Sequence, residues 1–188
     1  ITQAQLFYDA DADDRKYGDP NGALDGSIDG IVDGDTLESV VSGILVFTTA
    51  ATQSSNVGLY DIVGSGLTVI NPNYALTVLQ DPGNVGAFEI TPAQLTYVSN
   101  SASREYGDAN PAFSGAVEGL KNGDLLTSVT SGTLTFVTSA TLTSPVGAYE
   151  INGTGLTVTS GNYVGVIEQD GGNENQLEVV PAQLYYAA

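Results

Sequence analysis

Short stretches rich in β-branched and aromatic residues alternate with turn signals along the whole chain. LVFTTA (45–50) and LTFVTSA (134–140) are typical, because Thr, Val and Phe favour strands and Gly bounds both runs. Gly, Pro, Asn and Asp cluster about every ten residues, as in INPN and DPGN, where turns are expected. This spacing predicts an all-β fold of short strands, in the form of immunoglobulin-like β-sandwich domains.

One segment has a helical pattern. In GDTLESV (34–40), Asp35 is placed to cap a helix and Glu38 follows three residues later. The related segment GDLLTSV (123–129) keeps the Asp and lacks the Glu. The pattern predicts a single helical turn; a longer helix would favour a β-grasp-like fold with one short helix per copy.

The chain repeats itself without a gap when it is shifted by 89 positions. ITQAQLFY (1–8) aligns with ITPAQLTY (90–97), and about 43 of the 89 aligned positions are identical. VVPAQLYY (179–186) matches the same start once more. We therefore expect a first repeat at 1–89, a second at 90–178, and at 179–188 a terminal strand or the start of a third repeat.

The positions shared by the two copies are mainly Gly, Tyr, Asp and apolar residues. Shared Gly indicates turns, and shared aromatic residues indicate a small core. The joint AFEITPAQLTY contains no flexible linker, and Pro92 restricts its backbone. A short joint between similar modules predicts a stiff tandem array.

Composition removes several classes of function. The chain has no Cys, His, Met or Trp, so a thiol nucleophile, an imidazole base and a Cys/His zinc site are excluded. The net charge is −18, and four basic residues cannot neutralise a nucleic-acid backbone. No apolar run reaches the roughly 18 residues of a membrane span. The start at Ile1 predicts a segment of a longer protein.

A set of motifs in order resembles one known family. The string YGDANPAFSG is followed by a G-L-x-N-G-D motif, V-x-S-G-T-L-T-F, S-P-V-G-x-Y-x-I, G-L-T-V and V-x-P-A-Q-L. This order resembles the MBG ("mostly beta and glycine") domain of YGX type. The first copy departs from it at Gly22 and Asn56. The resemblance implies an extracellular, cell-surface location in filamentous-haemagglutinin-like bacterial adhesins, with no catalytic residues to transfer.

The sharpest local motif is DADADD (9–14). Asp9, Asp11 and Asp13 alternate and Asp14 follows, which is the kind of oxygen ligand spacing that Ca²⁺ uses. The other interpretation is a solvated acidic loop that keeps the surface soluble. The second copy has VSNSAS at this place, so a calcium site would belong to one copy alone.

Duplicated carboxylates and tyrosines allow two further interpretations. Paired carboxylates could catalyse glycoside hydrolysis, but turn contexts favour structural roles for the Asp residues, and we expect no enzyme. Tyrosines could form a glycan-binding surface, but their duplication favours core and corner roles with satisfied hydroxyls. The carboxylate candidates are Asp19/Asp108, Asp35/Asp124 and Asp61/Glu150; the duplicated tyrosines are Tyr8, Tyr17, Tyr60, Tyr74, Tyr97, Tyr106, Tyr149 and Tyr163.

These observations favour a structural spacer of a surface adhesin, whose partners are neighbouring repeats of the same protein. Two alternatives remain at this level. A terminal strand such as PAQLYYAA could join identical subunits into a filament by strand exchange. Alternatively, the acidic segment could make the chain a calcium-dependent binding module, with Ca²⁺ as its ligand.

Overall fold

The computed structural model describes residues 2–32 and 34–185, which divide into two compact units, Ile1–Pro92 and Ala93–Ala188. Short strands make up most of the ordered structure of each unit, and among the described residues each unit has one α-helical turn and one 3₁₀ turn. The prediction of an all-β chain with two repeated units is confirmed.

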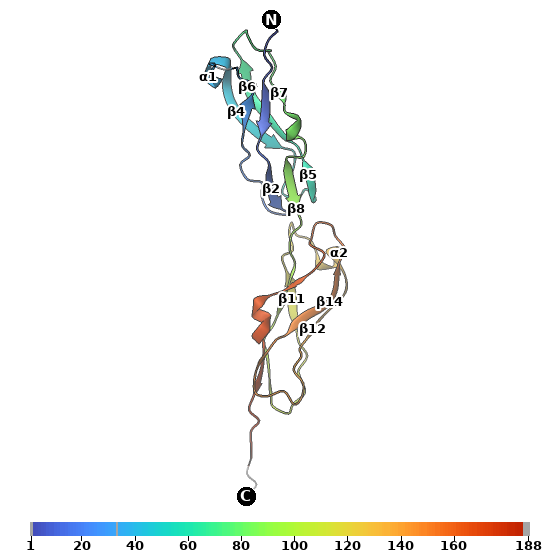
Figure 1. Ribbon diagram of the computed structural model, residues 1–188. Helices are drawn as coiled ribbons and strands as arrows, with labels where there is room; N and C mark the ends of the chain where they lie inside the picture. The colour runs from blue at the N-terminus through green and yellow to red at the C-terminus, as the bar shows by residue number, and fades with distance from the viewer. Residues whose placement is uncertain (1, 33, 186–188) are drawn as a thin grey trace. The chain divides into compact units, whose positions relative to one another are not determined.

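Unit 1 is built on two three-stranded sheets and one long two-stranded sheet. The central strand β1 pairs with β3 antiparallel and with β7 parallel. Likewise β8 pairs with β2 parallel and with β5 antiparallel, while β4 and β6 run side by side antiparallel (Figure 1). The elements are β1 (Phe7–Ala10), β2 (Asp13–Lys16), β3 (Gly26–Asp29), α1 (Leu37–Val40), β4 (Val41–Thr49), β5 (Gly58–Tyr60), β6 (Ile62–Val69), β7 (Leu79–Gln80), the 3₁₀ turn η1 (Pro82–Asn84) and β8 (Phe88–Thr91).

Unit 2 repeats this topology strand for strand. Its central strands are β9, between β11 and β15, and β16, between β10 and β13, and β12 pairs with β14. The repeated sequence therefore encodes a repeated sheet order. The elements are β9 (Thr96–Ser99), β10 (Ala102–Glu105), β11 (Gly115–Glu118), α2 (Leu126–Val129), β12 (Thr130–Val137), β13 (Gly147–Tyr149), β14 (Asn152–Val158), β15 (Glu168–Gln169), the 3₁₀ turn η2 (Gly171–Asn175) and β16 (Leu177–Val180).

Each unit encloses a small apolar core. In unit 1, Leu6 just before β1 is fully buried and packs in a cluster with residues of α1, β4, β6 and the segment before β7. In unit 2, an apolar cluster includes the buried residues Ile151 and Leu177, and Phe113 and Phe136 pack against it. The first cluster consists of Leu6, Val40, Val41, Val69 and Tyr74.

The predicted helical turn forms, but its predicted cap is wrong. The helix α1 begins after Thr36, whose backbone N–H donates to the Ser39 hydroxyl over 3.0 Å. Asp35 does not cap it, because its Oδ2 accepts the hydroxyl proton of Tyr74 at 2.8 Å. That hydroxyl also accepts from the Val32 N–H at 2.9 Å, so one buried tyrosine holds the turn before α1.

Replacing Tyr74 by phenylalanine is therefore expected to destabilise unit 1 by about 1–3 kcal/mol, because the Val32 N–H and Asp35 lose a partner together. Urea unfolding combined with hydrogen exchange on unit 1 peptides measures the change. Tyr163→Phe is the matched variant, because Tyr163 makes the same bonds to Asp124 and to the Lys121 N–H. Unchanged protection around Val32 would contradict this role of the hydroxyl.

Candidate functional site

The acidic segment 9–14 is divided between two sheets. Asp9 lies on β1, Asp11 lies in the connection, and Asp13 and Asp14 open β2. Within residues 2–32 and 34–185, no group of three or more acidic side chains is close enough together to hold a metal ion. The alternating aspartates of the sequence therefore do not form a preassembled set of metal ligands, and calcium binding stays a prediction.

Asp9 instead lies among carboxylates supplied by neighbouring strands. Asp29 ends β3 and Asp81 follows β7, the two strands that flank β1. Burial raises the pKa of Asp9 above its ordinary value of 3.8, and repulsion from Asp29, Asp81 and Asp11 raises it further. The ionised form of Asp9 is therefore disfavoured in the folded state.

Asp9→Asn is expected to raise the melting temperature of unit 1 near pH 7. The folded-state pKa is raised, so Asp9 contributes most stability below about pH 3.8 and loses it as the pH rises. The gain from Asp9→Asn should therefore disappear at about pH 3 and shrink in high salt. Thermal melts of both proteins across this pH range measure it; an equal gain at every pH would assign it to something other than charge.

The same pair of proteins tests calcium. Native-state binding of Ca²⁺ must raise the melting temperature of the natural chain, since a ligand stabilises the state that it binds. The rise should be smaller in Asp9→Asn. Absence of any shift between millimolar Ca²⁺ and a chelator would remove the calcium prediction.

Four of the six duplicated carboxylates, Asp35, Asp124, Asp61 and Glu150, accept hydrogen bonds within their own units. Asp61 is exposed and lies between β5 and β6, where its Oδ1 accepts from the Gly86 N–H at 2.9 Å. Glu150 accepts from the Ser139 N–H at 3.1 Å, and hydrogen bonding by the Ser139 side chain, above all, lowers the pKa of Glu150. With Asp35 and Asp124 bound to tyrosines, these groups serve as turn and strand connectors.

The tyrosine hydroxyls are likewise used for structure. Tyr60 donates to the Asn56 carbonyl and Tyr149 to the Pro145 carbonyl, over 2.8 and 2.7 Å. The Tyr8 hydroxyl accepts from the Leu67 N–H, and its ring meets the Phe47 ring edge to face with centroids 6.4 Å apart. For these residues the predicted structural use of the hydroxyl groups is confirmed, and glycan binding stays a separate prediction.

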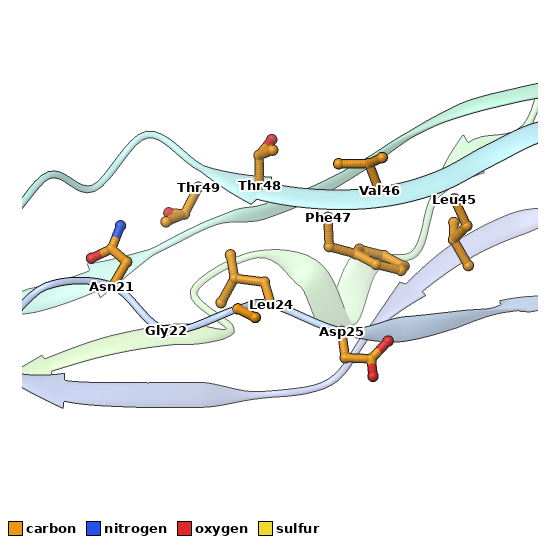
Figure 2. Close-up of a pocket in the computed structure, with 10 residues that line it drawn as sticks. Asn21, Gly22, Leu24, Asp25, Leu45, Val46, Phe47, Thr48 and Thr49 are labelled. Atoms are coloured by element: carbon orange, nitrogen blue, oxygen red, sulfur yellow. The ribbon is translucent and has the colours of Figure 1, made fainter.

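Unit 1 has a groove of about 610 Å³ between the 21–25 connection and β4. Figure 2 shows Leu24 and Phe47 pointing into this space from opposite sides, while the Asp25 carboxylate points away from it. The groove is therefore apolar between the side chains of Leu24 and Phe47. In unit 2, the larger Phe113 replaces Leu24 and Pro111 replaces Gly22, so the two copies differ here.

A buried arginine in each unit is the feature that the sequence interpretation missed. Arg15 on β2 is only 7% exposed; its Nε donates to Asn21 Oδ1 at 2.6 Å, and its Nη1 and Nη2 donate to the carbonyls of Lys16 and Thr52. Asn21 in turn donates to the Ala51 carbonyl at 2.7 Å. These bonds connect β2, the following loop and the segment after β4.

Unit 2 contains the same network. Arg104 is 6% exposed and donates to Asn110 Oδ1 at 2.6 Å and to the carbonyls of Glu105 and Thr141, and Asn110 donates to the Ala140 carbonyl. A signal existed in the sequence: the chain has only two arginines, and they are 89 positions apart. Among the described residues, every fully buried side-chain nitrogen or oxygen has a hydrogen-bond partner.

These features define a tandem all-β repeat protein whose polar groups mostly connect its own strands. The MBG domain (YGX type) family model matches residues 6–86 and again residues 95–171. The chain belongs to this family, whose domains occur in bacterial surface proteins. No curated protein and no solved structure matches the chain significantly. In the part that the structure describes, no helix has the length and apolar character needed to cross a bilayer.

Proposed function

We propose that the chain is a spacer segment of an extracellular bacterial surface adhesin. The observation that carries this proposal is the repetition of an entire unit, with its sheet order, its buried arginine network and its tyrosine-held turn. A binding or catalytic site needs to occur once, whereas a spacer gains length from every copy of a self-contained unit.

The connection between the units supports the same proposal. Strand β8 ends at Thr91, and Ala93 already forms a β-bridge with Tyr163 in unit 2. Only Pro92 lies between them, and proline has a nearly fixed φ angle. We expect so short a connection to limit bending between units, which a stiff spacer requires and a flexible tether does not.

The charge of the chain fits an extended array. Repeats 1–89 and 90–178 both carry a large excess of acidic over basic side chains, and the whole chain has a net charge of −18. Like charge on successive units opposes their collapse onto each other and keeps the array soluble.

The proposal is tested on cells. The parent protein is displayed with one, two or four copies of this pair of units and with an epitope tag at its outer end. Immunogold labelling should place the tag farther from the cell surface by an equal increment for each added pair. A tag distance that does not depend on the number of units would overturn the spacer role.

A further inference from the structure

We propose that unit 1 binds an extended segment of another protein, with apolar side chains flanked by basic ones, as an added strand along the free edge of β4. The site is the groove between the 21–25 connection and β4. It lies within unit 1, so the proposal goes beyond the spacer role and does not depend on it. Strand addition of this kind combines main-chain hydrogen bonds with pockets for alternate side chains.

The strand β4 has an open edge on the side of the groove. It pairs with β6 on one edge, and among the described residues no strand pairs with it on the other. The strand β3 is likewise the last strand of its own sheet. The two strands lie close together, because a Cβ on Gly26 of β3 would be 2.6 Å from Cζ of Phe47 on β4. Two packed sheets of unit 1 therefore end in edge strands on the same side.

The main chain of Phe47 is directed toward the open edge. Phe47 lies opposite Gly64 in the register, and Gly64 uses both its N–H and its carbonyl for Gln80, each over 2.8 Å. In an antiparallel ladder, the N–H and carbonyl of Phe47 then point away from β6, and those of Thr49, two residues on, do the same. Within residues 2–32 and 34–185, no hydrogen bond from another segment meets the main chain of Phe47. An added strand would find a donor and an acceptor at both positions.

The side chains of the groove leave room for an apolar residue of the added strand. Figure 2 shows Leu24 and Phe47 pointing toward each other, whereas Val46 and Thr48 lie on the opposite face of β4. A leucine or valine on the same face of the added strand as Phe47 would enter the space of about 610 Å³ between these walls. The alternate side chains of the segment would stay in solvent beside Val46 and Thr48.

Carboxylates on the 21–25 side of the groove determine which partner fits. Asp25 is the charged residue among those that line the groove. Asp13 Oδ2 lies 3.6 Å from the place of a Cβ on Gly22, and the Asp11 N–H donates to the Asp25 carbonyl. Lysine or arginine at the ends of an added segment would complement these carboxylates. A second copy of this chain, with its net charge of −18, would be repelled, so a basic partner is favoured.

Binding of a synthetic peptide to the isotope-labelled natural chain tests the proposal. The probe is Lys-Lys-Thr-Leu-Thr-Val-Thr-Lys-Lys, and NMR should show saturable amide shifts concentrated in β4 and the 21–25 connection. Replacing its lysines by glutamates should weaken binding about tenfold or more, because like charges then meet. Two further peptides carry N-methyl groups, one on Leu and Val and the other on the threonines. Only one of these sets can face β4, so one peptide should lose about tenfold in affinity and the other should not.

Leu24→Phe is the matched variant of the protein, because Phe113 has this place in unit 2 and is compatible with the fold. It should weaken peptide binding about tenfold, since the larger ring occupies the space for the apolar side chain. The proposal is overturned if no saturable shifts occur at β4, if both N-methylated peptides bind like the probe, or if Leu24→Phe binds it equally well. Shifts in β4 that follow the concentration of the chain alone would also overturn it, since a second copy would then be the occupant.

Discussion

Replacing Arg15 by alanine is expected to lower the free energy of unfolding of unit 1 by about 3 kcal/mol. The substitution removes three donated bonds at once and leaves Asn21 Oδ1 without the guanidinium. Bonds from a charged donor each contribute about 1.5–3 kcal/mol, and the Phe88 ring, 5.8 Å from the guanidinium carbon, loses its cation. In the natural protein, the cost of burying the guanidinium charge offsets part of the stability that these hydrogen bonds contribute.

Urea unfolding with hydrogen exchange resolved to unit 1 peptides measures this effect, with unit 2 as an internal reference. Arg15→Lys should recover only a small part of the loss, since an ammonium group cannot reproduce the planar fork that reaches three acceptors. Arg104→Ala should produce the same loss in unit 2, and Lys16→Ala, at an exposed neighbour, should produce little. A loss below about 0.5 kcal/mol for Arg15→Ala would show that the network does not hold the unit.

Replacing Gly64 by alanine is expected to destabilise unit 1 by about 3 kcal/mol or more. A Cβ at this position would lie 2.4 Å from Tyr8 Cβ and 2.5 Å from Tyr8 Cγ, which is far inside contact distance. Gln80 accepts from the Gly64 N–H and donates to its carbonyl, both at 2.8 Å, so the strand cannot easily retreat. The Tyr8 ring is also fixed by its contact with Phe47.

Thermal melting and hydrogen exchange detect this change. Gly153→Ala is the matched variant, because a Cβ there would lie 2.4 Å from the Tyr97 ring. Gly161→Ala and Gly165→Ala are controls, as nothing lies within 4 Å of a Cβ at either place and neither glycine has a positive φ. If Gly64→Ala melts like these controls, the close packing of glycine on tyrosine is not what holds β6 against β1.

Repetition was the strongest guide from sequence to structure. The gapless offset required two copies of one topology. The Thr-, Val- and Phe-rich run at 45–50 overlaps β4 up to Thr49, and the run at 134–140 overlaps β12 up to Val137. Local rules failed where a tertiary contact competed with them. Asp35 has the composition of a helix cap but bonds to Tyr74, which lies 39 residues away. No pattern within seven residues could reveal that partner.

The candidate site shows the same limit. The alternation of Asp9, Asp11 and Asp13 suggested that they share one loop. In the structure Asp9 lies on β1, Asp13 lies on β2, and Asp11 lies in the connection between these strands. Two of the carboxylates that raise the pKa of Asp9 by repulsion belong to Asp29 and Asp81. Only the pairing of β1 with β3 and β7 brings these residues close to Asp9. The sequence could have identified Arg15 as a structurally important residue, because an arginine recurs 89 positions later at Arg104. The sequence could not have predicted that Arg15 is buried, because arginines are mostly exposed.

The radius of gyration of the natural chain in solution, from small-angle scattering, tests the spacer account most directly. A compact globule of 188 residues would have a radius of gyration of roughly 16 Å. A stiff spacer should give a value well above this and a pair-distance distribution with the long tail of an elongated particle. A value near 16 Å with a symmetric distribution would contradict it, because two units folded back on each other add no reach.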